Sequence, residues 1–134
     1  QPRSRGLGDV YKRQNVGLLA YSPLGFGVLS GKYRNGKMPE NSRLKLFSNL
    51  ARFSNDKCFK ATDLYHDIAM KHDLSLTQMS LAFVNDRPFV TSNIIGATSM
   101  NQLKENIDSI NLKLSKEIIA EINSVNEKIP NPAP

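Results

Sequence analysis

The alternation of short apolar runs with segments of helical periodicity constrains this sequence more than any other feature. The run 17–21 (GLLAY) lies between turn-forming residues and predicts a strand buried on both faces, as in a parallel sheet. The run 93–96 (NIIG) predicts a second short strand. With the helical segments, the order becomes strand, long loop, helix, helix, strand, helix, helix. That order is typical of parallel β/α units.

The length of the chain limits how much of such a fold it contains. Two strands cannot close a barrel, and a complete (β/α)₈ barrel takes about 250 residues. The chain has 134 residues. It therefore amounts to about half of such a domain, or less.

Serine residues mark the starts of the later helices. Ser75 with Gln78, and Ser99 with Gln102, fit the capping box, in which serine and glutamine side chains each satisfy a free backbone N–H group. Ser115 is expected to cap the last helix. The periodicity predicts these inward-facing positions: Cys58, Ala61, Tyr65, Ile68, Ala69 and His72 in helix 57–72, Met100, Leu103, Ile107 and Ile110 after Ser99, and Ile118, Ile122, Val125 and Ile129 after Ser115.

The net charge of +6 raises the question of nucleic-acid binding. Half of it lies in segment 1–14, where four Lys or Arg against one Asp give +3. We interpret this Arg- and Gly-rich segment as a non-native leader before domain 15–134; a native basic loop is the alternative. Elsewhere Lys and Arg are scattered among acids, without the basic stripe of nucleic-acid modules. We expect no nucleic-acid partner and, since no run of about 18 apolar residues occurs, no membrane partner.

Cysteine and histidine usage predicts no metal site. Cys58 is the single cysteine, which excludes a disulfide framework, so a reducing cytoplasm is the expected location. His66 and His72 lie on one helix but about 240° apart around it, so the pair cannot converge on a metal. Both histidines are expected at the surface or its edge, and Cys58 and Tyr65 in the core.

The first strand runs into a loop rich in Gly and Pro, SPLGFGVLSGK. Small residues let a backbone approach a ligand closely. Tyr21 offers a ring for stacking, and the Ser22 hydroxyl and the Lys32 ammonium can both bind a pyrophosphate. In barrels of this kind, the loops after the last strands often hold phosphates. On these residues alone, a simple Gly-rich turn with a surface lysine and a core tyrosine is the favoured interpretation, and the phosphate-binding loop is the alternative.

The second strand runs into GATS and then a helix. A helix start favours an anion through its free N–H groups and partial positive charge, and Thr98 and Ser99 add hydroxyl groups. Gln102 and Asn106 are one turn apart on one face. Glu105 would repel a phosphate and suits an adenine amino group better. Ordinary helix capping with a solvated polar face stays open as the alternative.

Together, AYSPLGFGVLSGKY, the pair Ser42–Arg43 and IIGATSMNQLKENI resemble the aldo-keto reductases, in a branch with bacterial stress-type reductases and potassium-channel β subunits. The similarity covers 16–134, with the three motifs in order and at the expected spacing. It implies an α/β fold that is the C-terminal portion of a (β/α)₈ TIM barrel. About the last two β/α units and a C-terminal helix would be present, so the barrel would be incomplete.

The resemblance also implies a cofactor, NADP(H) in preference to NAD(H). By position, Tyr21 matches the residue that stacks on nicotinamide, and the loop around the pyrophosphate is matched by Ser22, Pro23, Leu24, Gly25 and Phe26. Lys32 matches a lysine near the phosphates, and Arg43 matches an arginine near the 2′-phosphate and adenine. The 2′-phosphate and ribose site is matched by Gly96, Thr98 and Gln102, and the adenine-binding pair by Glu105 and Asn106. Segment 33–56 is expected to form a flap over this cofactor.

The family carries a catalytic Asp, Tyr, Lys and His in the first half of the barrel, and none of those motifs is present here. We therefore assign no catalytic residue. The parent is expected to be an NADP(H)-dependent oxidoreductase that reduces small aldehydes or ketones to alcohols. The alternative is a nucleotide-binding regulatory or redox-sensing subunit with little turnover. Alone, the chain is expected to be inactive and to fold poorly, because strand 18–21 would lack its pairing partner.

Overall fold

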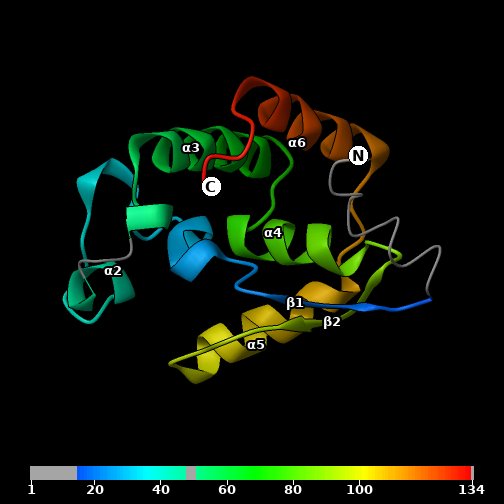
Figure 1. Cartoon of the computed structure of the whole chain (residues 1–134), viewed down its shortest axis with the longest axis horizontal. Helices are drawn as coiled ribbons and strands as arrows, with labels where there is room; N and C mark the ends of the chain where they lie inside the picture. Colours follow the sequence, from blue (N-terminus) through cyan, green and yellow to red (C-terminus); the bar gives the residue numbers. More distant parts are fainter. Residues whose placement is uncertain (1–14, 48–50, 134) are drawn as a thin grey trace, which may run out of the picture.

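The computed structural model describes residues 15–47 and 51–133. Two strands, β1 (Leu18–Tyr21) and β2 (Val90–Ile94), are combined with helices α2 (Arg43–Leu46), α3 (Asp56–Lys71), α4 (Leu76–Asn85), α5 (Met100–Asp108) and α6 (Lys116–Lys128) (Figure 1). Four short 3₁₀ segments connect them, Gly25–Ser30, Arg34–Gly36, Ala51–Phe53 and Ser109–Asn111. The predicted order of the strands and the four longer helices is confirmed, and the one-turn helix α2 lies inside the segment that was expected to be a loop. The predicted leader, 1–14, lies outside the described residues.

The two strands pair in parallel, with Leu18 opposite Val90 and Tyr21 opposite Ile94. The expectation that the first strand lacks a partner is therefore wrong: one of its edges is paired. The second strand begins at Val90, three residues before the predicted start at Asn93, and ends at Ile94, two residues before the predicted end at Gly96. The sequence did not indicate this start because Thr91 and Ser92 interrupt the apolar run. Thr91 was nevertheless a usable signal, since β-branched residues favour strands.

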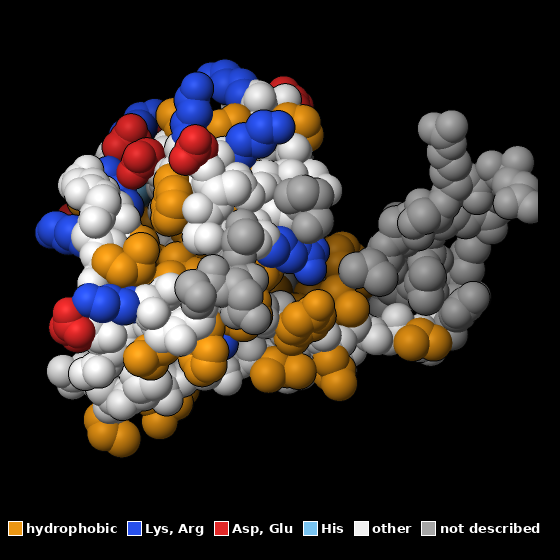
Figure 2. Space-filling model, turned by 60° about the vertical axis from the view of Figure 1, so that its left-hand side comes forward, with side chains coloured by type: hydrophobic (Ala, Val, Ile, Leu, Met, Phe, Trp, Pro, Cys, Tyr) orange, Lys and Arg blue, Asp and Glu red, His pale blue; other side chains and the backbone are white. Residues whose placement is uncertain are grey.

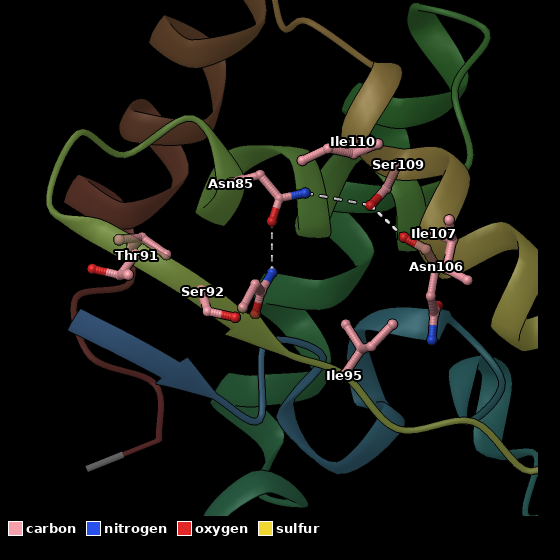
Figure 3. A pocket seen from close by; sticks show the side chains of 10 residues that line it. Asn85, Thr91, Ser92, Ile95, Asn106, Ile107, Ser109 and Ile110 are labelled. Atoms are coloured by element: carbon pink, nitrogen blue, oxygen red, sulfur yellow. Dashed lines mark hydrogen bonds between the residues drawn. The ribbon is translucent and has the colours of Figure 1, made fainter. Parts of the chain in front are cut away.

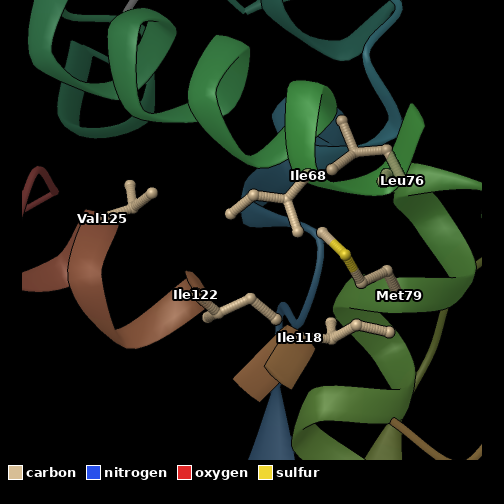
Figure 4. Packing of buried hydrophobic residues seen from close by; sticks show 7 residues of the cluster. Ile68, Leu76, Met79, Ile118, Ile122 and Val125 are labelled. Carbon is tan, nitrogen blue, oxygen red and sulfur yellow. The ribbon is translucent and has the colours of Figure 1, made fainter. Parts of the chain in front are cut away.

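Figure 1 shows α3, α4 and α6 above the two strands and α5 below them, with α2 set apart at the left of the view. Helix α4 lies between the strands and the pair formed by α3 and α6. The main core lies among these three helices and contains Ile68, Ala69, Leu76, Met79, Ile118, Ile122 and Val125 (Figure 4). Each Ile, Leu, Met or Val side chain of this core contributes about 1.5–3 kcal/mol when fully buried. The predicted inner faces of α3 and α6 are thus confirmed, apart from half-buried Tyr65, His72 and Ile129.

The predicted inner face of α5 is wrong for this chain. Met100, Ile107 and Ile110 are 77%, 55% and 60% exposed, and Leu103 alone is half-buried. The first strand is not buried on both faces either, since Leu19 is 59% exposed. Figure 2 shows hydrophobic side chains gathered along the lower part of the molecule. The periodicity identified apolar faces correctly, but burial requires further structure that the described residues do not supply.

The helix caps formed by serine are confirmed, but the reciprocal halves of the capping boxes are not. Ser75, Ser99 and Ser115 accept hydrogen bonds from the backbone N–H of the residue three positions later, at 3.4, 3.3 and 3.2 Å. The Gln78 side chain instead donates to the Glu105 carbonyl, and Gln102 turns to Thr98. Within the described residues, no helix is long and apolar enough to cross a membrane.

Candidate functional site

The two loops predicted to bind a ligand lie on opposite sides of one cleft. Because β1 and β2 are parallel and paired, their C-terminal ends meet at the same edge of the sheet. The cavity there has a volume of ≈ 590 Å³, within the range of small-molecule sites. The predicted residues that line it are Tyr21, Ser22, Pro23, Leu24, Phe26, Lys32, Arg43, Gly96, Thr98, Gln102, Glu105 and Asn106. Gly25 alone among the predicted residues does not.

The first loop has a strained backbone at the wall of this cavity. Ser22 and Phe26 have φ angles of 54° and 55°, in the left-handed region that side chains disfavour. Such conformations cost about 1–3 kcal/mol each and cluster at functional sites. Here the strain allows a tight turn directly after β1, closed by a 2.9 Å hydrogen bond from Gly25 N–H to the Ser22 carbonyl.

Gly27 makes room for Lys32 in the same loop. A Cβ at Gly27, whose φ is 91°, would lie 2.9 Å from Lys32 Cε and 3.0 Å from Nζ. The ammonium also lies 5.2 Å from the centre of the Tyr33 ring. Among the residues the structure describes, no carboxylate forms an ion pair with Lys32. Sequence reasoning missed Gly27 as a cleft residue, although a glycine inside a ligand-facing loop was a usable signal.

Arg43 enters the cleft from a well-anchored turn. Its neighbours Ser42 and Leu44 are buried, and Leu44 N–H donates to the Tyr33 hydroxyl at 3.3 Å. The guanidinium carbon lies 5.2 Å from the centre of the Phe26 ring. Phe26 in turn packs edge-on against Phe53, with ring centres 4.8 Å apart. In the described part of the chain Arg43 has no ion-pair partner, so two unpaired cations, Arg43 and Lys32, line the cavity.

On the opposite side, hydrogen bonds within the chain occupy the start of α5. Ser99 caps the helix, and the Gln102 side-chain oxygen accepts from both the N–H and the hydroxyl of Thr98, each at 3.0 Å. The capping alternative is therefore realised for these residues. A Cβ at Gly96 would meet nothing within 4 Å, so packing within the described chain gives no reason for glycine there.

Glu105 and Asn106 are held from behind the cleft. The Ser75 hydroxyl donates to Glu105 Oε1 at 2.5 Å. Asn106 is 5% exposed, and its side-chain amide donates to the Gly96 carbonyl at 3.2 Å. Asn106 thus stabilises the loop that carries Gly96, a role that sequence reasoning did not anticipate.

A second cavity of ≈ 420 Å³ lies between β2 and α5 (Figure 3). Polar side chains form a chain of hydrogen bonds along it: Asn93 donates to Asn85 at 3.0 Å, Asn85 to Ser109 at 3.4 Å, and Ser109 to the Asn106 carbonyl at 2.6 Å. Its lining contains no titratable side chain, so it offers no acid, base or charged ligand. The network links β2 and α4 to the backbone carbonyl of Asn106.

The groups with shifted pKa values lie outside the cleft. Burial raises the pKa of the Cys58 thiol, and burial also raises the pKa of the Tyr65 hydroxyl. Between α3 and α6, the hydrogen bond from the Lys71 ammonium holds the pKa of the Glu121 carboxyl below its ordinary value, with a further contribution from His72.

His72 meets carboxylates that sequence spacing could not place beside it. Its Nε2 lies 3.1 Å from Glu121, and one ligand atom each of His72, Glu117 and Glu121 lies within 4.8 Å of the others. The Lys71 ammonium already pairs with both carboxylates, at 2.8 Å from Glu121 and 3.6 Å from Glu117. These side chains therefore form a cluster of ion pairs between the C-terminal end of α3 and α6.

Comparison with known proteins adds a family match over most of the chain. The model of the "Aldo/keto reductase family" matches residues 2–127, a range that starts inside segment 1–14, whose origin stays a prediction. Protein Tas of Escherichia coli strain K12 is 50% identical over 129 residues, which cover 96% of this chain and 37% of Tas. A probable voltage-gated potassium channel subunit beta of Oryza sativa subsp. japonica is 35% identical over 126 residues, or 90% of this chain and 38% of that protein.

A solved structure, a glycerol dehydrogenase from Gluconobacter oxydans, matches with a TM-score of 0.71 at 23% identity. The match covers 94% of this chain and 38% of that structure, and it supports the fold alone. The chain thus spans well under half the length of the proteins it matches. The fold is the C-terminal portion of a (β/α)₈ barrel whose sheet is not closed by the described residues.

Proposed function

The chain belongs to the aldo/keto reductase family, and from this premise we propose that it supplies the NADP(H)-binding part of an enzyme that reduces aldehydes or ketones. One relative is an L-glyceraldehyde 3-phosphate reductase of Escherichia coli O157:H7, 35% identical over 123 residues, which supports a reductase in the general sense. The cofactor, the carbonyl substrate and the absence of activity from the chain alone belong to the proposal.

One observation supports the cofactor most directly. Two loops from neighbouring parallel strands enclose a cavity that is lined by two cations without carboxylate partners among the described residues. A dinucleotide with phosphate groups would supply the missing negative charge. Gly27 adds to the fit, because its lack of a side chain leaves Lys32 free to lie across the loop. The family resemblance assigns Lys32 and Arg43, though not Gly27, to this role.

Different residues of the cleft would bind different parts of the cofactor. Tyr21 is 74% exposed while lining the cavity, so a ring face is available for stacking on nicotinamide. The loop from Ser22 to Phe26, together with Lys32, would hold the pyrophosphate. Arg43 would grip the 2′-phosphate through two N–H groups, which a lysine cannot do in the same geometry. This is the reason to propose NADP(H) before NAD(H).

Thr98 and Gln102 require a rearrangement in this proposal. Gln102 must release Thr98 before the Thr98 N–H or hydroxyl can donate to a phosphate, whereas the amide N–H groups of Gln102 can donate as they stand. The exchange replaces one pair of hydrogen bonds by another and costs little net free energy. Glu105 faces the cavity as an acceptor for the adenine amino group.

When bound, the reduced nicotinamide supplies a hydride for the carbonyl carbon of the substrate. The residues of this chain bind and orient the cofactor, and we assign them no proton transfer. The general acid that protonates the carbonyl oxygen would belong to the part of the barrel that this chain does not include. A cytoplasmic location is part of the same proposal, supported by the single, free cysteine.

A regulatory subunit is the second candidate, favoured by the 35% identity to a potassium channel subunit beta. Such a protein would keep the nucleotide cleft and show little turnover. Measuring NADPH oxidation with a panel of aldehydes and ketones distinguishes the two. NADPH binding with negligible oxidation across the panel supports the regulatory candidate.

The cofactor assignment is tested in a complete barrel, made by replacing the matching segment of E. coli Tas with residues 15–134. Arg43→Ala removes a charge-assisted contact, so NADPH affinity should fall about 10- to 100-fold, with NADH affinity little changed. Lys60→Ala on α3, which removes an exposed cation outside the cleft, is the matched control. Equal losses for both nucleotides would contradict the 2′-phosphate role.

A further inference from the structure

We propose that Ser75, the residue that caps α4, is a positioning residue for the adenine-binding carboxylate of Glu105. The proposal rests on the function proposed above and adds a residue that lies 30 positions away in the sequence. Ser75 itself does not line the cleft, whereas Glu105 does.

The proton of the Ser75 hydroxyl has a defined direction. A serine hydroxyl has one proton to donate and two lone pairs that accept. One lone pair accepts from the Gln78 N–H at 3.4 Å, as expected of a helix cap. The proton is directed to Glu105 Oε1 at 2.5 Å, and an ionised carboxylate can only accept. The two bonds are thus compatible, and Ser75 links the start of α4 to the cleft.

The first turn of α4 supports Glu105 in other ways. The Gln78 side chain donates to the Glu105 backbone carbonyl at 3.4 Å. Thr77, which is 6% exposed, lines the same cavity as Glu105. The free N–H groups of a helix N-terminus carry partial positive charge, so the carboxylate is stabilised where it lies. Glu105 is therefore fixed by a different helix from the one that carries it.

The consequence concerns the other carboxylate oxygen. In the described part of the chain, the Glu105 carboxylate makes this one side-chain hydrogen bond, to Oε1. Oε2 is left to accept a hydrogen bond from the 6-amino group of adenine. If Ser75 did not hold Oε1, the carboxylate would rotate among several rotamers, and ordering it on binding would weaken affinity.

Ser115 provides a matched control for the capping role. It caps α6 in the same way, accepting from Ile118 N–H at 3.2 Å, and it does not line the cleft. Replacing a serine cap with alanine costs about 0.5–2 kcal/mol of stability in either helix. A difference between the Ser75 and Ser115 variants in nucleotide binding therefore reports on Glu105 and not on helix capping.

The experiment uses the same complete barrel, with residues 15–134 in E. coli Tas, and two nucleotides. One is NADPH; the other is its hypoxanthine analogue, which lacks the 6-amino group. Dissociation constants are measured for the parent chimera and for the variants Glu105→Ala, Ser75→Ala, Ser75→Asp, Ser75→Thr and Ser115→Ala. Asp keeps the cap but repels Glu105, and Thr keeps the hydroxyl.

We expect Glu105→Ala to weaken NADPH binding about tenfold or more and the hypoxanthine analogue little. Ser75→Ala should weaken NADPH binding several-fold and binding of the hypoxanthine analogue little, and Ser75→Asp should weaken NADPH binding at least as much. Ser75→Thr and Ser115→Ala should change the affinity for either nucleotide little. If Glu105→Ala does not distinguish the two nucleotides, the adenine assignment within the proposed function fails. If Glu105→Ala distinguishes them but Ser75→Ala and Ser75→Asp do not, the positioning role of Ser75 is refuted.

Discussion

Replacing Gly27 with alanine should weaken NADPH binding through Lys32 and not through a general loss of stability. At a φ of 91°, any residue with a Cβ is strained by about 1–2 kcal/mol. The Cβ would also lie 2.9 Å from Lys32 Cε, closer than such atoms approach. Because the far end of a lysine is flexible, the side chain will move and take the ammonium out of its position. That movement should cost about tenfold in affinity for NADPH, the equivalent of one charge-assisted contact of about 1.4 kcal/mol.

Gly36→Ala is the matched control, because Gly36 has a φ of 72° and its Cβ would meet nothing within 4 Å. Both variants should lose a similar amount of unfolding free energy in urea denaturation of the Tas chimera. Only Gly27→Ala should lose affinity in a fluorescence titration with NADPH, and Lys32→Met should lose at least as much. If Gly27→Ala and Gly36→Ala bind NADPH equally well, the role given to Lys32 is wrong.

Three further predictions concern stability, pH and the flap. Ile122→Ala should cost about 2–5 kcal/mol of unfolding free energy in urea denaturation of the Tas chimera, and a cost under about 0.5 kcal/mol would contradict its place in the core. The Lys71 ammonium lowers the pKa of Glu121, so this carboxylate stabilises the fold above its unfolded pKa, and the contribution is lost as pH falls through the lower folded value. The thermal midpoints of the Tas chimera and its Glu121→Gln variant should therefore converge in acid, and a constant difference would contradict this. Phe47→Ala removes a 56% exposed side chain at the cleft from segment 33–56 and should speed NADPH release from the chimera in stopped-flow measurements; an unchanged rate would argue against a flap there.

The features that the sequence predicted correctly depend on short-range chemistry. Ser75, Ser99 and Ser115 begin helices because a hydroxyl satisfies an N–H three residues away, wherever the helix packs. The buried stripe of α6 follows from its period. The cleft itself could be predicted because parallel strands bring their C-terminal ends together, and so the two loops after them.

The features that the sequence did not reveal depend on distant partners. Met100 lies on an apolar helix face, yet is 77% exposed because nothing in the described chain covers it. The bond between Ser75 and Glu105 joins residues from different helices, so no spacing rule could indicate it. The same holds for His72 and the Glu121 carboxylate across the α3–α6 interface. The role of Gly27 required the position of the Lys32 side chain.

A crystal structure of the Tas chimera bound to NADPH would show where each phosphate group lies. We expect the pyrophosphate against the loop after β1 and Lys32, and the 2′-phosphate between Arg43 and the start of α5. Phosphate groups found away from both strand-end loops would contradict this expectation, even if the nucleotide bound tightly.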